Sequence, residues 1–294
     1  MPAPRPARRD FRFFDTSLDE FLASPLSNLK MELLPTPSKP SQFLTKYELR
    51  GYLREHSQHT TVRGCNSFRT CKSEFLCPFC TPKRLHADRA SIDGILRGAP
   101  SAEFATLTAQ HSTADSLMAL WDAITGAWAV MSKGKGWDTF RTRHAVSGQI
   151  RAFDCTWSAE QGWHPHWHCA FVFEKELTEH ALAGFRAELA ERWVAALHSL
   201  GYSAQAAAQR SEAVRNPAAV AAYLTGTGPF KLSVTDSPSF TPGDLLHAAT
   251  DGDLAARELW GEYETASLHR RALAGAGAFR TMPRIAQRRV VQFE

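Results

Sequence analysis

The sequence has no hydrophobic run long enough to cross a membrane. None of its apolar stretches reaches the roughly 18 residues that a spanning helix needs. The first nine residues are rich in proline and arginine and lack the apolar core of a secretory signal. We therefore expect a soluble, cytoplasmic protein without a membrane partner, whose cysteine thiols stay reduced.

The chain also lacks internal repeats, low-complexity tracts and a strong excess of one charge. Its 34 Lys and Arg residues and 30 Asp and Glu residues give a net charge of +4, which is compatible with a nucleic-acid partner but does not identify one. Hydrophobic residues make up 44% of the 294 residues, enough for the core of one large domain or two. The composition is that of a globular protein.

The most informative stretch present is Trp163–Phe173, where histidines alternate with other residues. In a strand this alternation places His164, His166 and His168 on one face. The alternative is an aromatic cluster, but two imidazoles at positions i and i+2 are costly to bury without a ligand. The pattern therefore favours a metal site.

A second strand, expected over residues 149–157, adds a carboxylate to the same face. If the two strands form a hairpin centred on residue 161, Asp154 lies opposite His168. Two imidazoles and one carboxylate suit a catalytic divalent ion, with magnesium or manganese as well as zinc as candidates. The alternative for Asp154 is an ordinary polar residue in a cross-strand pair.

These residues resemble the His-hydrophobe-His motif of the HUH endonucleases. The segment Gly162–His168 is similar to the form found in plasmid rolling-circle replication initiators. Phe104–Thr108 resembles the family's first strand motif, and Ala221–Thr225 resembles its tyrosine helix. The segment Ala152–Thr156 resembles a strand that usually carries Glu where this chain has Asp154.

The resemblance implies an enzyme that cuts one strand of DNA. A tyrosine hydroxyl attacks a phosphodiester, which gives a 5′-phosphotyrosine link and a free 3′-hydroxyl that primes replication. The implied fold is a palm-like antiparallel sheet, and the implied partner is single-stranded or melted origin DNA. A host replication helicase and polymerase are further candidate partners. A transposase or a mobilisation relaxase with the same chemistry is the nearest alternative.

Chemistry alone assigns compatible roles to the residues of the histidine strand. A Mg²⁺ or Mn²⁺ ion held by His166, His168 and Asp154 would polarise an anionic phosphate and act as a Lewis acid. His164 is either a further ligand or the acceptor of the tyrosine proton.

Tyr223 is the best-placed candidate nucleophile among the five tyrosines. Asn216 and Pro217 predict the start of a short helix that presents it, although a buried core tyrosine is the alternative. The chain departs from the family pattern at Ala219, where many relatives have a Glu that can serve the second cleavage. Lys231 is the nearest basic residue after the tyrosine, and we assign it to phosphate contact.

Four of the six cysteines fall within sixteen residues, and they are Cys65, Cys71, Cys77 and Cys80. The closing C-x2-C is typical of a tetrahedral Zn²⁺ site, and four closed ligands make such a site structural. Two disulfides are the alternative in an oxidising compartment, and His56, His59 or His86 could replace Cys65. Lys83 and Arg84 lie close by in sequence and are candidate DNA contacts or solvated surface.

The overall pattern predicts an α+β protein with helices covering an antiparallel sheet. Two alternative functions use these elements without a tyrosine nucleophile: a zinc-ribbon nucleic-acid-binding protein without catalysis, and a metal hydrolase that activates water. We expect a short strand near residues 203–209 and one long helix from about Pro242 to Ala274. The expected regions are an N-terminal extension with a mobile start and a helix (1–55), a zinc-binding module (56–95), the HUH catalytic domain (100–232) and a helical accessory region (233–294).

Overall fold

The structure is a computed structural model that describes residues 36–40, 44–66, 68–226, 232–233 and 237–281. Five strands form one antiparallel sheet in the order β4-β1-β3-β2-β5. The α+β class and the antiparallel sheet are as predicted. The strands are β1 (Ser101–Thr108), β2 (Val146–Ser158), β3 (Gly162–Phe173), β4 (Arg210–Ala213) and β5 (Leu273–Gly277).

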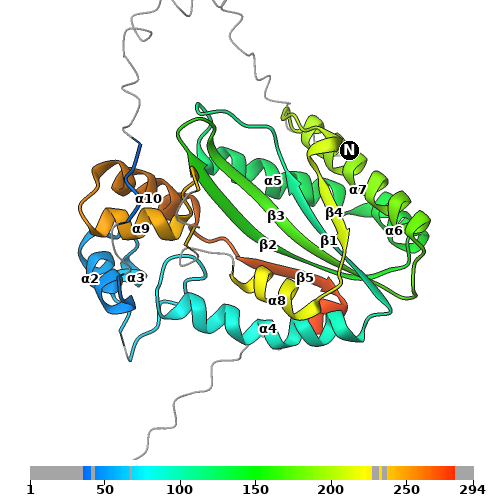
Figure 1. The fold of residues 1–294 in the computed structure, drawn as a ribbon, viewed down its shortest axis with the longest axis horizontal. Coiled ribbons are helices and arrows are strands. Elements are labelled where there is room, and N and C mark those ends of the chain that lie inside the picture. The colour runs from blue at the N-terminus through cyan, green and yellow to red at the C-terminus, as the bar shows by residue number, and fades with distance from the viewer. Residues whose placement is uncertain (1–35, 41–43, 67, 227–231, 234–236, 282–294) are drawn as a thin grey trace, which may run out of the picture. The chain divides into compact units, whose positions relative to one another are not determined.

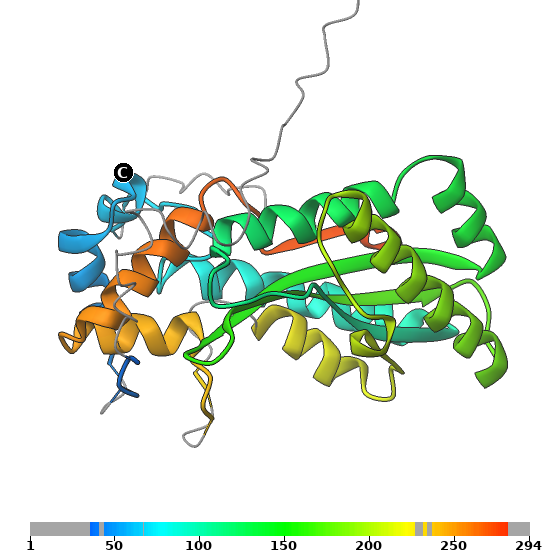
Figure 2. The same ribbon diagram turned by 90° about the horizontal axis from the view of Figure 1, so that it is seen from above.

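Helices lie on both faces of the sheet (Figure 1), and Figure 2 shows the two helical layers on either side of the strands. One face is covered by α5 (Leu117–Met131), α6 (Gly134–Arg143) and α7 (Glu179–Ser199). The other face is covered by α4 (Cys80–Gly98) and α8 (Pro217–Gly226), which pack against each other.

Four further helices lie beside the sheet, near the turn that joins β2 to β3 (Figure 1). Short 3₁₀ turns occur at Ala206–Ala208 and Ala278–Thr281. Among the described residues, no helix is both long and apolar enough to span a bilayer. The four helices are α2 (Lys46–His56), α3 (Thr60–Arg63), α9 (Pro242–Thr250) and α10 (Leu254–Ala266).

Side-chain alternation along β3 divides the sheet into two chemically different faces. Trp163, Trp167 and Phe171 are buried in the larger hydrophobic core with α5 and α7. The neighbouring positions, which include His166 and His168, point to the face covered by α4 and α8, because successive strand side chains alternate. Burial of large aromatic side chains therefore fixes which way the histidines point.

The C-terminal part of the described chain differs from the single long helix predicted for it. The helix is interrupted at Gly252, whose φ of +100° suits glycine, and α10 restarts with Asp253 accepting a hydrogen bond from the backbone N–H of Ala256 (2.9 Å). After α10, the chain forms β5, which pairs with β2 at the edge of the sheet. The accessory region is therefore not helical throughout.

The strand predicted for residues 203–209 is also wrong. This segment contains the 3₁₀ turn, and the strand begins only at Arg210. The side chain of Gln209 accepts a hydrogen bond from the backbone N–H of Thr108 (2.8 Å), so it takes the place of a backbone partner at the end of β1. Because a side chain rather than a paired strand satisfies the end of β1, residues 203–209 need no alternation of polar and apolar residues, and the sequence does not reveal this contact.

A buried ion pair fastens α7 to the sheet. Glu103 of β1 is 0% exposed, and its carboxylate accepts hydrogen bonds from Arg186 Nε (2.6 Å) and Ser211 Oγ (3.0 Å). The side chain of Arg186 is 26% exposed. It extends from the surface of α7 to the buried carboxylate, so that its guanidinium group neutralises the charge of Glu103.

Replacing Arg186 with alanine should lower the free energy of unfolding by about 3 kcal/mol, because a buried carboxylate would lose its counter-charge. As a control, Arg97→Ala removes the exposed pair with Asp93 (2.9 Å) and should cost less than about 1 kcal/mol. Urea denaturation of both variants measures the difference. Equal losses would contradict the role assigned to Arg186.

Candidate functional site

The β2–β3 hairpin places the predicted carboxylate among the histidines. Asp154 pairs with His166, whereas His168 pairs with Ala152, so the predicted pairing of Asp154 with His168 is wrong by two residues. The turn is centred on residue 160 because Ser158 pairs with Gly162. A shift of two residues preserves the face on which a side chain lies, and Asp154 therefore still meets both imidazoles.

Asp154, His166 and His168 form one compact, buried group. The Nε2 atoms of the two histidines are 2.9 Å apart. Asp154 Oδ2 lies 3.8 Å from His166 Nε2 and 3.4 Å from His168 Nε2. All the ligand atoms lie within 4.8 Å of one another, as suits residues that bind one metal ion.

Outer hydrogen bonds orient both rings, as would suit metal binding. His166 Nδ1 lies 3.2 Å from the carbonyl oxygen of His164, which can only accept, so we assign the ring proton to Nδ1 and a lone pair to Nε2. Thr106 Oγ1 lies 3.2 Å from His168 Nδ1 across the β1–β3 pair. Partners of this kind orient metal-binding histidines.

The charge state of His166 also fits a cation ligand. Burial and the neighbouring His168 together lower the pKa of His166 to about 3, against the opposite effect of Asp154. The imidazole is therefore neutral at pH 7, and its lone pair can bind an ion. Two imidazoles and one carboxylate leave positions open for water or a phosphate oxygen.

Tyr223 lies beside this group on α8. The side chain of Asn216 accepts a hydrogen bond from the backbone N–H of Ala219 (3.1 Å), which confirms the predicted helix start. The ring of Tyr223 lies 4.7 Å from that of His168 and 5.7 Å from that of Phe104, measured between centroids. Its side chain is 42% exposed, so it is not the core tyrosine that was the alternative.

His164 does not join the three-residue group. Its Nδ1 lies 2.5 Å from His111 Nε2, and His111 Nδ1 lies 3.0 Å from the carbonyl oxygen of Gln161. Because a carbonyl only accepts, His111 carries its proton on Nδ1, and His164 donates from Nδ1. Burial and, to a smaller extent, His111 lower the pKa of His164 to about 4. His164 therefore keeps a lone pair on Nε2.

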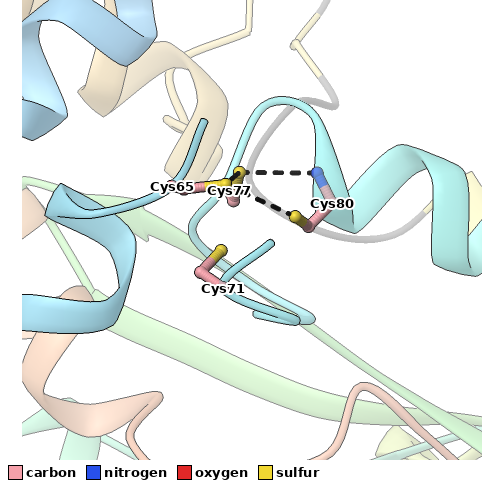
Figure 3. Close-up of side chains that lie close together, drawn as sticks. All are labelled: Cys65, Cys71, Cys77 and Cys80. Atoms are coloured by element: carbon pink, nitrogen blue, oxygen red, sulfur yellow. Dashed lines mark hydrogen bonds between the residues drawn. The ribbon is translucent and has the colours of Figure 1, made fainter. Parts of the chain in front are cut away.

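The four cysteines predicted to bind zinc converge in space (Figure 3). Cys65 Sγ lies 3.5 Å from Cys77 Sγ and 3.6 Å from Cys80 Sγ, and all four thiols are free. No disulfide joins them, and His56, His59 and His86 are not part of the group.

The electrostatics of the cysteine group also suit a metal ion. The backbone N–H of Cys80 points to Cys77 Sγ (3.4 Å), and Cys80 begins the 19-residue helix α4, whose N-terminus favours a thiolate. Hydrogen bonds from Cys71 and Cys77 lower the pKa of Cys80 to about 2, whereas the hydrogen bonds of Cys71 with Cys77 and Cys80 raise the pKa of Cys71. Negative charge therefore lies on Cys80, one of the four sulfur atoms that could bind a Zn²⁺ ion.

The predicted DNA-contact residues have different surroundings. Arg84 forms an ion pair with Glu74 (2.7 Å), and Lys83 is exposed. Lys231 lies outside the described residues. No role was predicted for Thr106 as a partner of His168 or for His111 as a partner of His164. Both contacts join segments more than 50 residues apart, at separations of 62 and 53 residues, and no local pattern signals them.

The purified chain should contain one tightly bound Zn²⁺ per molecule, and Cys77→Ser should lose it and unfold at a lower temperature. Cys155→Ala changes a buried cysteine outside the group and should keep the metal. Elemental analysis and thermal unfolding test both variants. A Cys77→Ser protein with a full complement of zinc would refute the assignment.

In zinc-loaded protein, Thr106→Val should weaken Mn²⁺ binding at the Asp154–His166–His168 group by about 10- to 100-fold, because His168 loses its outer hydrogen bond. Thr142→Val, an exposed substitution on α6, should leave the affinity unchanged. Calorimetric titration with Mn²⁺ measures both. An unchanged affinity in Thr106→Val would contradict the role given to this hydroxyl.

A comparison with known families identifies the segment that contains most of these residues. Residues 63–185 match the family model described as "Replication protein", a match that includes the four cysteines and the Asp154–His166–His168 group and ends before α8. No match to the chain was found among curated proteins or among solved structures. The family match agrees with the resemblance given by the motifs, since residues 63–185 are similar to replication proteins.

Proposed function

We propose that this protein nicks one strand of origin DNA to begin rolling-circle replication, with the Tyr223 hydroxyl as the nucleophile. The observation that carries the proposal is the position of Tyr223, whose exposed ring lies against His168 of the Asp154–His166 group. A metal hydrolase that activates water needs no tyrosine at this position. A purely structural zinc ribbon needs no second ligand group.

The proposed step forms a bond between the Tyr223 phenolic oxygen and phosphorus and breaks the bond from phosphorus to the 3′ oxygen of the preceding nucleotide. The phenolic proton passes to water at the exposed edge of the site or to a neighbouring base. The leaving oxygen gains a proton and becomes the free 3′-hydroxyl. The 5′ side of the cut remains attached to the tyrosine as a phosphodiester.

Asp154, His166 and His168 are the residues that would hold a divalent ion, with Mg²⁺ or Mn²⁺ as the proposed ion. When bound, such an ion supplies Lewis-acid stabilisation to the charge that develops on the phosphate. Thr106 keeps the His168 ring in place. Phe104 supports the ring of Tyr223 from the side (5.7 Å between centroids).

His164 is proposed to accept the tyrosine proton through water, the second of the two roles considered for it, because it lies at the end of the metal group away from Tyr223. Its Nε2 lone pair is free to accept because Nδ1 donates to His111. A role as a further ligand is less well supported, since His164 stands apart from the group formed by the other three residues.

The zinc module is proposed to contact DNA backbone. Lys83 is the better candidate of the two predicted residues, because the Arg84 guanidinium is already paired with Glu74. Lys46 and Arg50 of α2 lie over the ring of Phe79, at 5.0 and 4.5 Å from its centroid, and add positive charge beside the cysteine knuckle. Exposed cations of this kind bind phosphates without sequence preference.

Tyr223→Phe should abolish a covalent protein–DNA adduct while leaving DNA binding nearly unchanged, because only the attacking oxygen is removed. Circular single-stranded DNA that carries the cognate plasmid origin, with Mn²⁺, provides the substrate. Denaturing gels detect the adduct, and fluorescence anisotropy measures binding.

Tyr263→Phe is the matched control, because Tyr263 is buried in α10 at 1% exposure and should not reach DNA. This variant should form the adduct at close to the wild-type level. An adduct that persists in Tyr223→Phe would refute the nucleophile assignment.

A further inference from the structure

A cleft of about 320 Å³ lies beside the candidate metal group, where β1 ends. Its volume is at the lower end of the range for small-molecule sites, about 300–1,000 Å³. Three segments line it: the end of β1 with the residues that follow, the β2–β3 turn with the start of β3, and the chain before β4. Besides Thr108, the polar side chains that line it are Gln110, His111, Gln161, His164, Gln205 and Gln209.

The walls of this cleft are fixed by specific contacts. Gly162 has a φ of +70°, and a Cβ atom there would lie 2.9 Å from Thr113 Cα, so the hairpin turn packs closely against the segment after β1. His111 bridges the same two segments through Gln161 and His164. In the segment before β4, Gln209 Nε2 donates to the Gln205 carbonyl (2.9 Å). The cleft is therefore built before any ligand arrives.

The chemistry of the lining suits a nucleobase rather than a phosphate. No Lys, Arg, Asp or Glu is among the lining residues. The carboxamides of Gln110, Gln161 and Gln205 make no hydrogen bond with any described residue, so their donors and acceptors are available to a ligand. A carboxamide can form paired hydrogen bonds with a base edge, and histidine rings can stack on an unpaired base.

The position of the cleft relative to Tyr223 determines which base it would receive. Tyr223 contacts His168, at one end of the metal group. The cleft begins at the other end of the group. Its lining residue Thr108 pairs with His166, and its lining residue His164 lies two positions before His166 on β3, on the side away from His168. In phosphoryl transfer the attacking and leaving oxygens lie roughly in line on opposite sides of phosphorus. The leaving nucleotide therefore extends toward the cleft.

We infer that this cleft binds the base of the nucleotide that leaves with the free 3′-hydroxyl, and so selects the base on that side of the nick. The inference rests on the proposed function, since it takes Tyr223 as the nucleophile. The residues that select the base are Gln110 and Gln205, which offer free carboxamides from two neighbouring segments of the lining. Gln209 instead acts as a positioning residue.

The test uses zinc-loaded full-length protein, Mn²⁺ and circular single-stranded DNA with a randomised segment. One nick linearises the circle and leaves both sides of the cut on the same molecule. Adducts are first counted on denaturing gels, and the two ends of the linear DNA are then sequenced. The wild-type protein should show a strong preference for one base at the 3′ end. Gln110→Ala/Gln205→Ala should reduce that preference at least about fivefold and leave the preference at the 5′ end unchanged.

Gln58→Ala is the matched control, because Gln58 is an exposed glutamine outside the cleft, and it should keep the wild-type preference. Adducts with no base preference at the 3′ end would overturn the inference and leave the proposed function standing. A preference that survives in the double variant would do the same. Failure of the wild-type protein to form any adduct would instead overturn the proposed function, and this inference with it.

Discussion

The pairing of β1, β3 and β2 in register is the constraint on which the candidate site depends. Opposite residues of an antiparallel pair share a face, so Asp154 meets His166, and Thr106 meets His168. A slip of one residue would turn every one of these side chains to the opposite face. The large buried aromatic residues on that other face, such as Trp167, make such a slip costly. Packing of the core thus sets the chemistry of the site.

The cysteine group and Tyr223 are connected through the packing of α4 against α8, although they lie far apart in the sequence. Cys80 is both a member of the cysteine group and the first residue of α4. Further along α4, Ile92 and Leu96 pack in the same hydrophobic cluster as Leu224 of α8, one residue after Tyr223. Anchoring the start of α4 therefore restricts the helix against which the tyrosine segment rests. A structural metal in this place would therefore help to hold Tyr223 in position.

Local sequence patterns were sufficient for part of this site. Alternation along β3 predicted the facing imidazoles, the C-x2-C spacing predicted the cysteine group, and Asn216 predicted the start of α8. The exact hairpin pairing, the contact of His111 with His164, strand β5 and the cleft were not predicted. Each of these depends on segments that meet only after the chain has folded, and turn length or side-chain packing decides them. The palm-like arrangement implied by the family resemblance stays a prediction.

The edge strand β5 has a consequence for synthesis of the protein. Leu273 of β5 pairs with Ala152 of β2, although more than 100 residues separate the two in the sequence. The ribosome therefore makes β2 long before it makes β5. Until then, the outer backbone N–H and C=O groups of β2 lack their final partners, and an open strand edge readily pairs with another chain. The nascent polypeptide is therefore most vulnerable to aggregation in the interval between these two strands.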